Sequence, residues 1–591
     1  MLITILRLIR IIPASNFAIA LMMALFLFSS LLEVLGIGSI APFINLATNP
    51  ELLRETPWLE TIYLNSGIGE PTQFVALLGL VVILLFCGKT LISWLTQVMI
   101  FRFSARQQKL LVDNLVDKYL AAPYNYYLKR NSSEIIDNII EIANRFIFIL
   151  QPLFFAIANA FVLVALISLL FYTSSITVTI LLIIILPVLW LINSFRQTIA
   201  NWGRETRDSK QQMIKIISHS LGGIKETKII GCEAYFSEQI KLQSQRLEKS
   251  STNFASFNIL PRFLIETVMV IAVVGVVCYF VFIGENLDRL NGVLGVFAIA
   301  SIRMLPAFSG TIGGLNTLRN NSYTVDRIWL DLQELAQLKD NYLGNLEVAY
   351  KAEARPQQLA FNDCIELENI SYRYAARSEY AIDGLSLTIQ KGESIAFIGK
   401  SGAGKTTLVD LVLGLLIPQQ GNLRVDGVSV YGNLRAWQDT IGYIPQSIFL
   451  TDDTLRRNIA FGVPDNLIDE AKVWQAIAAS QLTEVVDSLD RGLSTRVGER
   501  GVLLSGGQRQ RVGIARALYH EREILVLDEA TAALDNDTEK LVTEAINSLS
   551  GQKTLITIAH RLTTVEKCDR IFLIEEGKIV KSGNYQSVVS G

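Results

Sequence analysis

The hydrophobic positions of this chain are concentrated in its first half, in runs long enough to cross a membrane. A spanning helix needs roughly 20 apolar residues, and six runs approach or exceed that length. They lie near residues 17–43, 73–99, 146–172, 174–195, 261–283 and 291–313. Further along, short strand-like segments alternate with polar loops. We therefore predict an all-α membrane domain with six spanning helices over 1–320, a linker over 321–358 and an α/β domain over 359–591.

Charged residues between the runs predict the orientation of the chain in the membrane. The segments 101–145 and 196–258 are rich in Lys and Arg, whereas 46–72 carries four glutamates and one arginine. Because positively charged loops remain in the cytoplasm, we expect both chain ends there, in a bacterial inner membrane. The first residues, with Arg7 and Arg10, predict a helix lying in the membrane surface.

The overall composition limits the kinds of partner and bound metal that we expect. The 53 Lys and Arg nearly balance the 55 Asp and Glu, so net charge gives no argument for nucleic-acid binding. The five cysteines are scattered without metal-like spacing, which argues against a disulfide framework or a zinc site. The expected partner is the membrane and its lipids.

Three motifs in the second half point to nucleotide chemistry. GKSGAGKTT, from Gly399 to Thr407, is a phosphate loop whose backbone N–H groups surround phosphates while Lys405 and Thr406 reach phosphate and Mg²⁺. LLSGGQRQR, from Leu503, places Ser-Gly-Gly at a predicted helix N-terminus, which is a second anion site. An apolar strand then ends in Asp528, a Mg²⁺ ligand, and Glu529, a carboxylate able to deprotonate water.

Together these motifs resemble the ATP-binding cassette (ABC) ATPases, and with six spans the chain resembles an ABC exporter half-transporter. The resemblance implies ATP and Mg²⁺ as cofactors and an ATP hydrolase that drives transport. The ATP-binding residues carried over are Tyr374, Gly399, Lys400, Ser401, Gly402, Ala403, Gly404, Lys405, Thr406, Thr407, Ser505, Gly506, Gly507 and Gln508.

The resemblance also assigns roles within the site. Tyr374 matches the aromatic residue that stacks on adenine, and Gln446 in YIPQ matches the glutamine at the metal and attacking water. Glu529 is the general base, and His560 in ITIAHRL matches the switch histidine. The metal residues are Thr406, Gln446 and Asp528.

The same resemblance implies the assembly. In such exporters the Ser505 motif completes the site of a second chain, so one membrane half with one cassette implies a homodimer. The tips at 121–139 and 221–236 match coupling helices that contact the ATPase; in the alternative reading they are capped turns.

Charged residues inside the spans are costly and are by default functional candidates. They are Glu33, Lys89, Arg262, Glu266 and Arg303. The three cations are predicted to line a cavity for an anionic headgroup such as pyrophosphate. Two alternatives stay open: Arg262 and Glu266 neutralise each other at i, i+4 spacing, or the long side chains reach the nearest interface.

The segment from Ser39 to Gly67 extends the first span and predicts a short external helix. Its apolar face would be formed by Leu52, Leu53, Trp58, Leu59, Ile62 and Tyr63. With GIKETKIIG and PRFLIE, it resembles the lipid-linked oligosaccharide flippases, relatives of the exporters that move lipid A. That group uses an external helix for the lipid tail and a basic cavity for the pyrophosphate-oligosaccharide. Lys89 departs from the expected arginine, and a lysine lacks the bidentate fork that grips pyrophosphate.

The expected function is therefore ATP-driven export or flipping of a lipid-linked oligosaccharide or a similar anionic glycolipid by alternating access. The alternatives are a lipid A-like lipid or a hydrophobic drug or peptide as cargo. Six spans and one cassette argue against a soluble ABC ATPase acting on nucleic acid. An importer on the same plan or a regulatory channel stays open.

Overall fold

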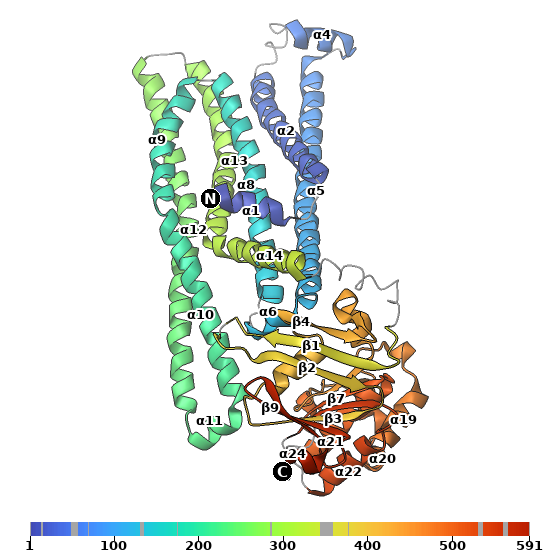
Figure 1. Ribbon diagram of the computed structural model, residues 1–591. Helices are drawn as coiled ribbons and strands as arrows, with labels where there is room; N and C mark the ends of the chain where they lie inside the picture. Colours follow the sequence, from blue (N-terminus) through green and yellow to red (C-terminus); the bar gives the residue numbers. More distant parts are fainter. Residues whose placement is uncertain are drawn as a thin grey trace. The chain divides into compact units, whose positions relative to one another are not determined.

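The chain forms two compact units in a computed structural model, shown in Figure 1. The model describes residues 2–12, 16–48, 57–68, 70–130, 135–136, 138–173, 175–283, 287–342, 359–375, 377–529, 536–559 and 565–589. The helical unit comprises Met1–Ala122 and Arg130–Gln337. The sheet unit comprises Pro123–Lys129 and Leu338–Gly591.

Within its described residues, the helical unit contains six helices that are long and apolar enough to cross a membrane, as the hydrophobic runs predict. The spanning helices are α2 (Asn16–Thr48), α5 (Pro71–Leu120), α8 (Ala143–Thr173), α9 (Ser175–Ser194), α12 (Glu233–Ile283) and α13 (Leu287–Asn320). Its remaining elements are α1 (Leu2–Ile11), α4 (Pro57–Asn65), the π-helix η1 (Asn138–Ile142), α10 (Arg196–Gly222), α11 (Ile224–Ile230) and α14 (Ser322–Tyr342).

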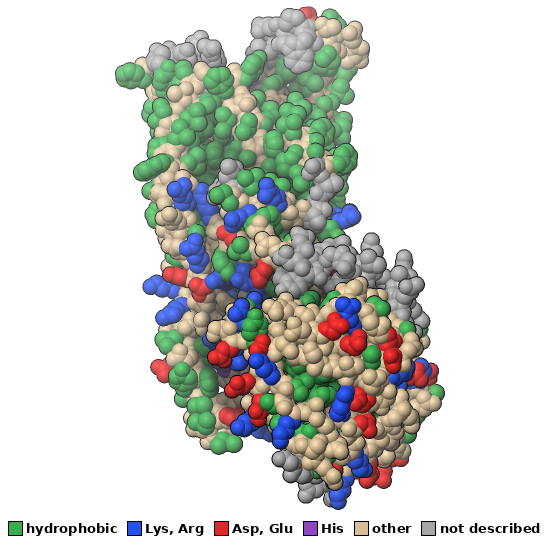
Figure 2. Space-filling model, viewed as in Figure 1, with side chains coloured by type: hydrophobic (Ala, Val, Ile, Leu, Met, Phe, Trp, Pro, Cys, Tyr) green, Lys and Arg blue, Asp and Glu red, His purple; other side chains and the backbone are tan. Residues whose placement is uncertain are grey.

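The spanning helices continue well beyond the apolar runs. Figure 1 shows α10 and α12 extending side by side to a tip formed by α11. In Figure 2, hydrophobic side chains cover one end of the helical unit, and Lys and Arg side chains gather where that belt stops. The cytoplasmic tips predicted near 121–139 and 221–236 contain the short helices α6 (Tyr124–Leu128) and α11.

Close helix contacts in the helical unit depend on small residues. A Cβ at Gly314 of α13 would lie 2.3 Å from the carbonyl oxygen of Pro152 in α8, so only glycine allows this approach. Leu166, Phe297 and Met304 are among the fully buried residues that form the core of α8, α9, α12 and α13.

The sheet unit is built on two β-sheets. The antiparallel sheet has the order β2-β1-β4-β5, and the second sheet has the order β10-β9-β3-β8-β7-β6 with only β10 antiparallel to its neighbour. The first sheet contains β1 (Cys364–Tyr372), β2 (Ile382–Gln390), β4 (Gln420–Val425) and β5 (Val428–Ser429). The second contains β3 (Ser394–Ile398), β6 (Ile441–Ile444), β7 (Ile524–Asp528), β8 (Thr554–Ile558), β9 (Arg570–Glu575) and β10 (Lys578–Gly583).

The two helices that begin at the phosphate-binding motifs bury their apolar faces in different hydrophobic clusters. Helix α16 (Lys405–Val412) buries Leu408 and Val412 in the cluster between the two sheets. Helix α21 (Gly506–Tyr519) buries Val512 and Ile514 in a second cluster. The other helices here are α6, α17 (Leu434–Gln438), α18 (Leu455–Ile459), α19 (Glu470–Ala479), α20 (Thr483–Ser488), α22 (Asn536–Asn547) and α24 (Tyr585–Val589), with the 3-10 turns η2 (Val430–Gly432), η3 (Asp465–Leu467), η4 (Gly492–Ser494) and η5 (Glu499–Gly501).

Candidate functional site

The phosphate loop connects the end of β3 to the start of α16, at the carboxyl edge of the parallel strands, where ligands of such sheets bind. Gly399 and Gly404 have φ of 147° and 107°, values that favour glycine. A Cβ at Gly399 would lie 2.2 Å from the carbonyl oxygen of Ile574, and one at Gly404 would lie 2.5 Å from that of Ala381. The loop backbone therefore packs directly on neighbouring backbone, which holds its N–H groups in place.

Lys405 is folded onto this loop. Its side chain is 5% exposed, and Nζ donates hydrogen bonds to the carbonyl oxygens of Gly399 (2.7 Å) and Lys400 (3.0 Å). Burial lowers the pKa of the Lys405 amine, while the negative charges of Glu529 and Asp528 act to raise it. The amine is thus held at the loop by two neutral carbonyl acceptors, and a bound phosphate would offer it stronger, charge-assisted acceptors.

The two threonines after Lys405 differ in burial. Thr406 is exposed, whereas Thr407 is buried and its Oγ1 lies 3.1 Å from the hydroxyl of Tyr374. The Tyr374 ring also packs edge-on against Tyr372, with 5.1 Å between centroids. The structure therefore brings Tyr374 to the helix that begins at Lys405, and it leaves the Thr406 residue exposed.

Acidic residues meet this loop at the end of β7. Asp528 is 8% exposed and accepts a hydrogen bond from the Tyr443 hydroxyl at 3.3 Å. Glu529 has a φ of 48°, an uncommon conformation for a residue other than glycine, and its N–H donates to the carbonyl oxygen of Ile558 in β8 at 3.1 Å. Nε2 of Gln446 donates to Oε2 of Glu529 at 2.6 Å. The structure thus joins two residues that the sequence singled out independently, while His560 lies outside the described residues.

Asp410 is a residue that the sequence reasoning missed. It lies in α16, and burial together with the nearby charge of Asp528 raises its pKa to about 6. The only signal in the sequence was a single acid within the apolar run TLVDLVLGLL. A carboxyl that titrates close to neutral pH beside the Asp528 carboxylate adds a proton-dependent charge to the site.

Helix α6 folds as part of the sheet unit, close to this group. The Tyr372 hydroxyl donates to Oδ1 of Asn125 in α6 at 3.1 Å. Burial raises the pKa of the neighbouring Tyr124, and the charge of Asp410 adds to the effect. The first predicted cytoplasmic tip is therefore packed against residues next to Tyr374 and α16.

The second anion-binding end is the start of α21. Ser505 is the N-cap: its hydroxyl accepts from the N–H of Gln508 at 3.2 Å, and Oε1 of Gln508 accepts from the N–H of Ser505 at 2.9 Å. This reciprocal capping box fixes the first turn, which contains Gly506 and Gly507. Among the described residues no hydrogen bond joins this turn to the phosphate loop, and the two helices bury their apolar faces in different clusters.

Two of the intramembrane cations converge on one acid in the helical unit. Glu33 of α2 is 1% exposed, and its Oε1 lies 2.6 Å from Nζ of Lys89 in α5 and 2.8 Å from Nε of Arg303 in α13. Arg262 and Glu266 of α12 are both exposed, and within the described part of the chain they form no ion pair with each other. We call Glu33, Lys89 and Arg303 the Glu33 cluster. The three residues were predicted from the sequence as functional candidates, but their mutual contact was not.

The predicted external helix is present as α4. Leu59 is 6% exposed and packs with Phe74 of α5, and the Tyr63 ring lies edge-on to Phe74 at 5.3 Å. Ile62 and Leu64 are 50% and 70% exposed. Leu59 and Tyr63 therefore anchor α4 on α5, while Ile62 of the same predicted apolar face remains half exposed. Leu52 and Leu53 lie outside the described residues, and so does the side chain of Trp58.

Comparison with known families agrees with this organisation. Residues 16–299 match the model of the ABC transporter transmembrane region, and residues 382–532 match the ABC transporter model. Among solved structures, the chain is similar to a bacterial Atm1-family ABC exporter with ATP bound, with a TM-score of 0.75 and 22% identity over 98% of this chain and 97% of that one. That likeness establishes the fold.

Comparison with curated proteins finds relatives over most of the chain. An ATP-dependent lipid A-core flippase of Cupriavidus pinatubonensis is 30% identical over 482 residues, covering 80% of this chain and 79% of the relative. A protein of the same description from Ralstonia nicotianae is 30% identical over 481 residues, covering 80% and 78%.

Proposed function

The chain belongs to the ABC transporter family as an ATP-hydrolysing exporter, and on that premise we propose that its cargo is an anionic glycolipid that it moves between membrane leaflets. The observation that carries the proposal is the Glu33 cluster, two cations and one anion held inside the membrane-spanning helices. The curated relatives, described as lipid A-core flippases, support a phosphate-bearing lipid.

The Glu33 cluster retains a positive charge after internal pairing. Glu33 neutralises one of its two cations, and the side chain of Arg303 is 40% exposed whereas that of Lys89 is 15% exposed. Arg303 is therefore the more accessible cation, and a guanidinium presents the planar fork that matches phosphate. We assign the first contact with a phosphate to Arg303, with Lys89 as a supporting charge. Arg262, exposed on α12, is the third cation of the proposed cavity.

Two cargo classes share this chemistry. A lipid-linked oligosaccharide is favoured by α4, which presents apolar side chains at the far end of the spans from α11, as Figure 1 shows. A lipid A-type glycolipid is favoured by the descriptions of the relatives. A neutral hydrophobic drug needs no cation in the cavity, so its transport would tolerate the loss of Arg303.

For the ATP reaction we propose a homodimer in which each chain completes the site of the other. The phosphate loop with Lys405 binds the phosphates from one chain, and Ser505, Gly506 and Gly507 of the second chain bind them from the opposite side. The separate packing of α16 and α21 supports this arrangement. Glu529, held by Gln446, removes the proton from the attacking water, and Tyr374 stacks on adenine.

The residues around Asp528 fit a magnesium ion. The carboxylate of Asp528, the hydroxyl of the exposed Thr406 and the amide oxygen of Gln446 are hard oxygen donors of the kind Mg²⁺ prefers. When bound with ATP, the ion neutralises phosphate charge. Nε2 of Gln446 is engaged with Glu529, which leaves the amide oxygen as the side available to a ligand.

The charge pattern of the loops supports an inner-membrane location with both chain ends in the cytoplasm. In this orientation α10, α11 and α12 extend on the side of ATP, and α4 lies on the opposite side of the membrane.

The test is the ATPase activity of the purified protein in lipid nanodiscs, without cargo, with lipid A-core glycolipid and with lipid-linked oligosaccharide. We expect at least one glycolipid to stimulate hydrolysis in the wild type. Neutralisation of Lys89, Arg262 and Arg303 together, in a Glu33→Gln background so that no buried carboxylate is left unpaired, should remove the stimulation and leave basal hydrolysis intact. Arg262→Gln alone measures the share of that residue. Equal stimulation of wild type and the combined variant would refute a cargo phosphate at these cations.

A further inference from the structure

The geometry points to a second anion site, separate from the Glu33 cluster: we propose that a cleft where α9 meets α10 binds the phosphate of an anionic phospholipid from the cytoplasmic leaflet. The cleft has a volume of about 320 Å³ and is lined by Trp190, Asn193, Ser194, Arg196 and Gln197. We call it the α9–α10 cleft. It shares no residue with the ATP site or with the Glu33 cluster.

The length of α9 indicates the position of the cleft relative to the membrane. Its 20 residues extend about 30 Å, the thickness of the hydrocarbon core of a bilayer. The helix ends at Ser194, and the polar helix α10 begins at Arg196. The cleft therefore lies at the level of the lipid headgroups, on the side of the helical unit that carries α11.

Two cations meet at this level without a carboxylate. Nη2 of Arg319, in the last turn of α13, donates to Oδ1 of Asn193 at 2.7 Å, and Nη1 donates to Oδ1 of Asn316 at 3.4 Å. Arg196 lines the cleft itself, and Arg319 is joined to the cleft through Asn193, so both cations belong to this site. Within the described residues neither forms an ion pair with an acid. Two like charges at one cleft without a counter-charge favour an anion, and a phosphate offers charge-assisted acceptors to guanidinium groups.

The surface beside the cleft fits an acyl chain. Ile183, Leu186 and Trp190 are 67%, 56% and 73% exposed and follow each other at i, i+3 and i+7 on one face of α9. Asn193 and Gln197 continue the same spacing into the cleft. An apolar stripe that ends in a polar, positively charged cleft matches a lipid, with its chain on the stripe and its phosphate at the arginines. Trp190 at their junction is a typical interfacial residue.

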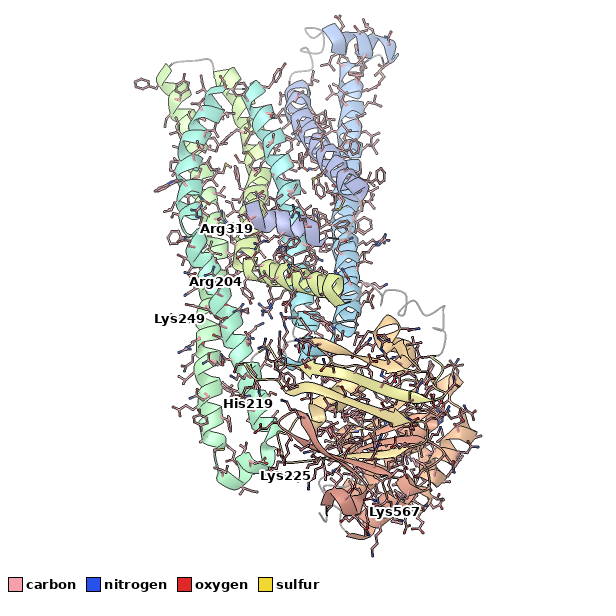
Figure 3. The ribbon with its side chains drawn as sticks, viewed as in Figure 1. Arg204, His219, Lys225, Lys249, Arg319 and Lys567 are labelled. Atoms are coloured by element: carbon pink, nitrogen blue, oxygen red, sulfur yellow. The ribbon has the colours of Figure 1, made fainter. Side chains whose placement is uncertain are left out.

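Other basic residues of this region lie further from the apolar belt. In Figure 3, Arg319 lies nearest to the apolar part of the bundle, and Arg204, Lys249, His219 and Lys225 follow toward the α11 tip. Arg204 is exposed on α10, two turns after Arg196, and does not line the cleft. It therefore offers a matched control with the same charge on the same helix.

The test uses quenching of Trp190 by brominated lipids in nanodiscs containing the full protein. The emission of Trp190 is the difference between wild type and Trp190→Phe, which removes the signal of the other tryptophans. Phosphatidylglycerol brominated near the head of its chains is compared with equally brominated phosphatidylcholine. Each arginine near a membrane surface contributes about a fivefold preference for an anionic lipid. We expect phosphatidylglycerol to be favoured at least about fivefold.

The outcomes separate the sources of phosphate. Arg196→Gln and Arg319→Gln should each reduce the preference about fivefold, and Arg204→Gln should retain it. Equal quenching by both lipids, or the same loss in Arg204→Gln, would overturn the proposal. If millimolar inorganic phosphate alone removed the preference, the site would take free phosphate and the assignment to a membrane lipid would be wrong. Basal ATPase activity of each variant verifies that it is folded.

Discussion

The contact between Glu33 and Lys89 makes a quantitative prediction for a double-mutant cycle. Glu33→Gln and Lys89→Met keep approximate side-chain volume and remove the charges. Loss of one partner of a buried ion pair costs about 3–5 kcal/mol. Glu33 is 1% exposed, but Lys89 and Arg303 are 15% and 40% exposed, so the charges left uncompensated are only partly buried. We therefore expect Glu33→Gln to cost about 2–3 kcal/mol.

The double variant should be less destabilised than the sum of the single variants, because the Lys89 charge is no longer present when its partner is removed. We expect a coupling energy of about 1.5–2 kcal/mol. The free energies are measured by reversible unfolding in mixed micelles with increasing dodecyl sulfate, for the wild type, both single variants and the double variant.

A control cycle distinguishes this pair from a general effect of charge removal. Arg262 and Glu266 are exposed at i, i+4 spacing on α12 and form no mutual ion pair in the described part of the chain. Arg262→Met and Glu266→Gln should therefore be additive within about 0.5 kcal/mol. A coupling energy for Glu33 and Lys89 as small as that of the control would refute the account of the Glu33 cluster.

Three further predictions concern other charged groups. Asp410, whose pKa is raised to about 6 by burial and by Asp528, binds a proton more tightly folded than unfolded. The free energy of unfolding should therefore decrease by about 1.5 kcal/mol, after allowance for solvent screening, as the pH rises from about 4 to about 6. Thermal unfolding of Asp410→Asn, measured over the same pH range, should lack this decrease. Asp331 is 3% exposed and accepts from the Tyr119 hydroxyl (2.9 Å) and from Nδ2 of Asn138 (2.7 Å), and it pairs with Arg130 at 3.2 Å. Asp331→Ala should cost about 3–5 kcal/mol in chemical unfolding, and a loss below about 1 kcal/mol would show that the network contributes little. Glu529→Gln should retain ATP binding in a nucleotide-binding assay and lose hydrolysis, and sustained turnover would remove Glu529 from the role of base.

The elements of this protein could be predicted from the sequence where the signal is local. Six apolar runs correspond to six spanning helices in the part of the chain that the structure describes, because length and hydrophobicity alone decide whether a helix can cross a bilayer. The phosphate loop could also be predicted from the sequence, because its glycines meet a local requirement for positive φ at Gly399 and Gly404. Gln446 and Glu529, assigned separately, are in contact.

Contacts between distant segments could not be predicted in the same way. Glu33 and Lys89 are 56 residues apart, and their pairing depends on the rotation of α2 and α5 about their axes, which a mostly apolar helix does not specify. Likewise, the outward direction of Ile62 in α4 depends on where Phe74 of α5 lies. The environment of Asp410 follows from the packing of β7 beside α16, which brings Asp528 near it.

The most direct test of the central claim is translocation of a labelled anionic glycolipid in proteoliposomes, followed by its accessibility to a reagent outside the vesicle. With the wild-type protein, addition of ATP should change the accessible fraction of lipid A-core glycolipid or of lipid-linked oligosaccharide. Glu529→Gln should leave that fraction unchanged. ATP hydrolysis by the wild type without movement of either glycolipid would contradict the proposed function.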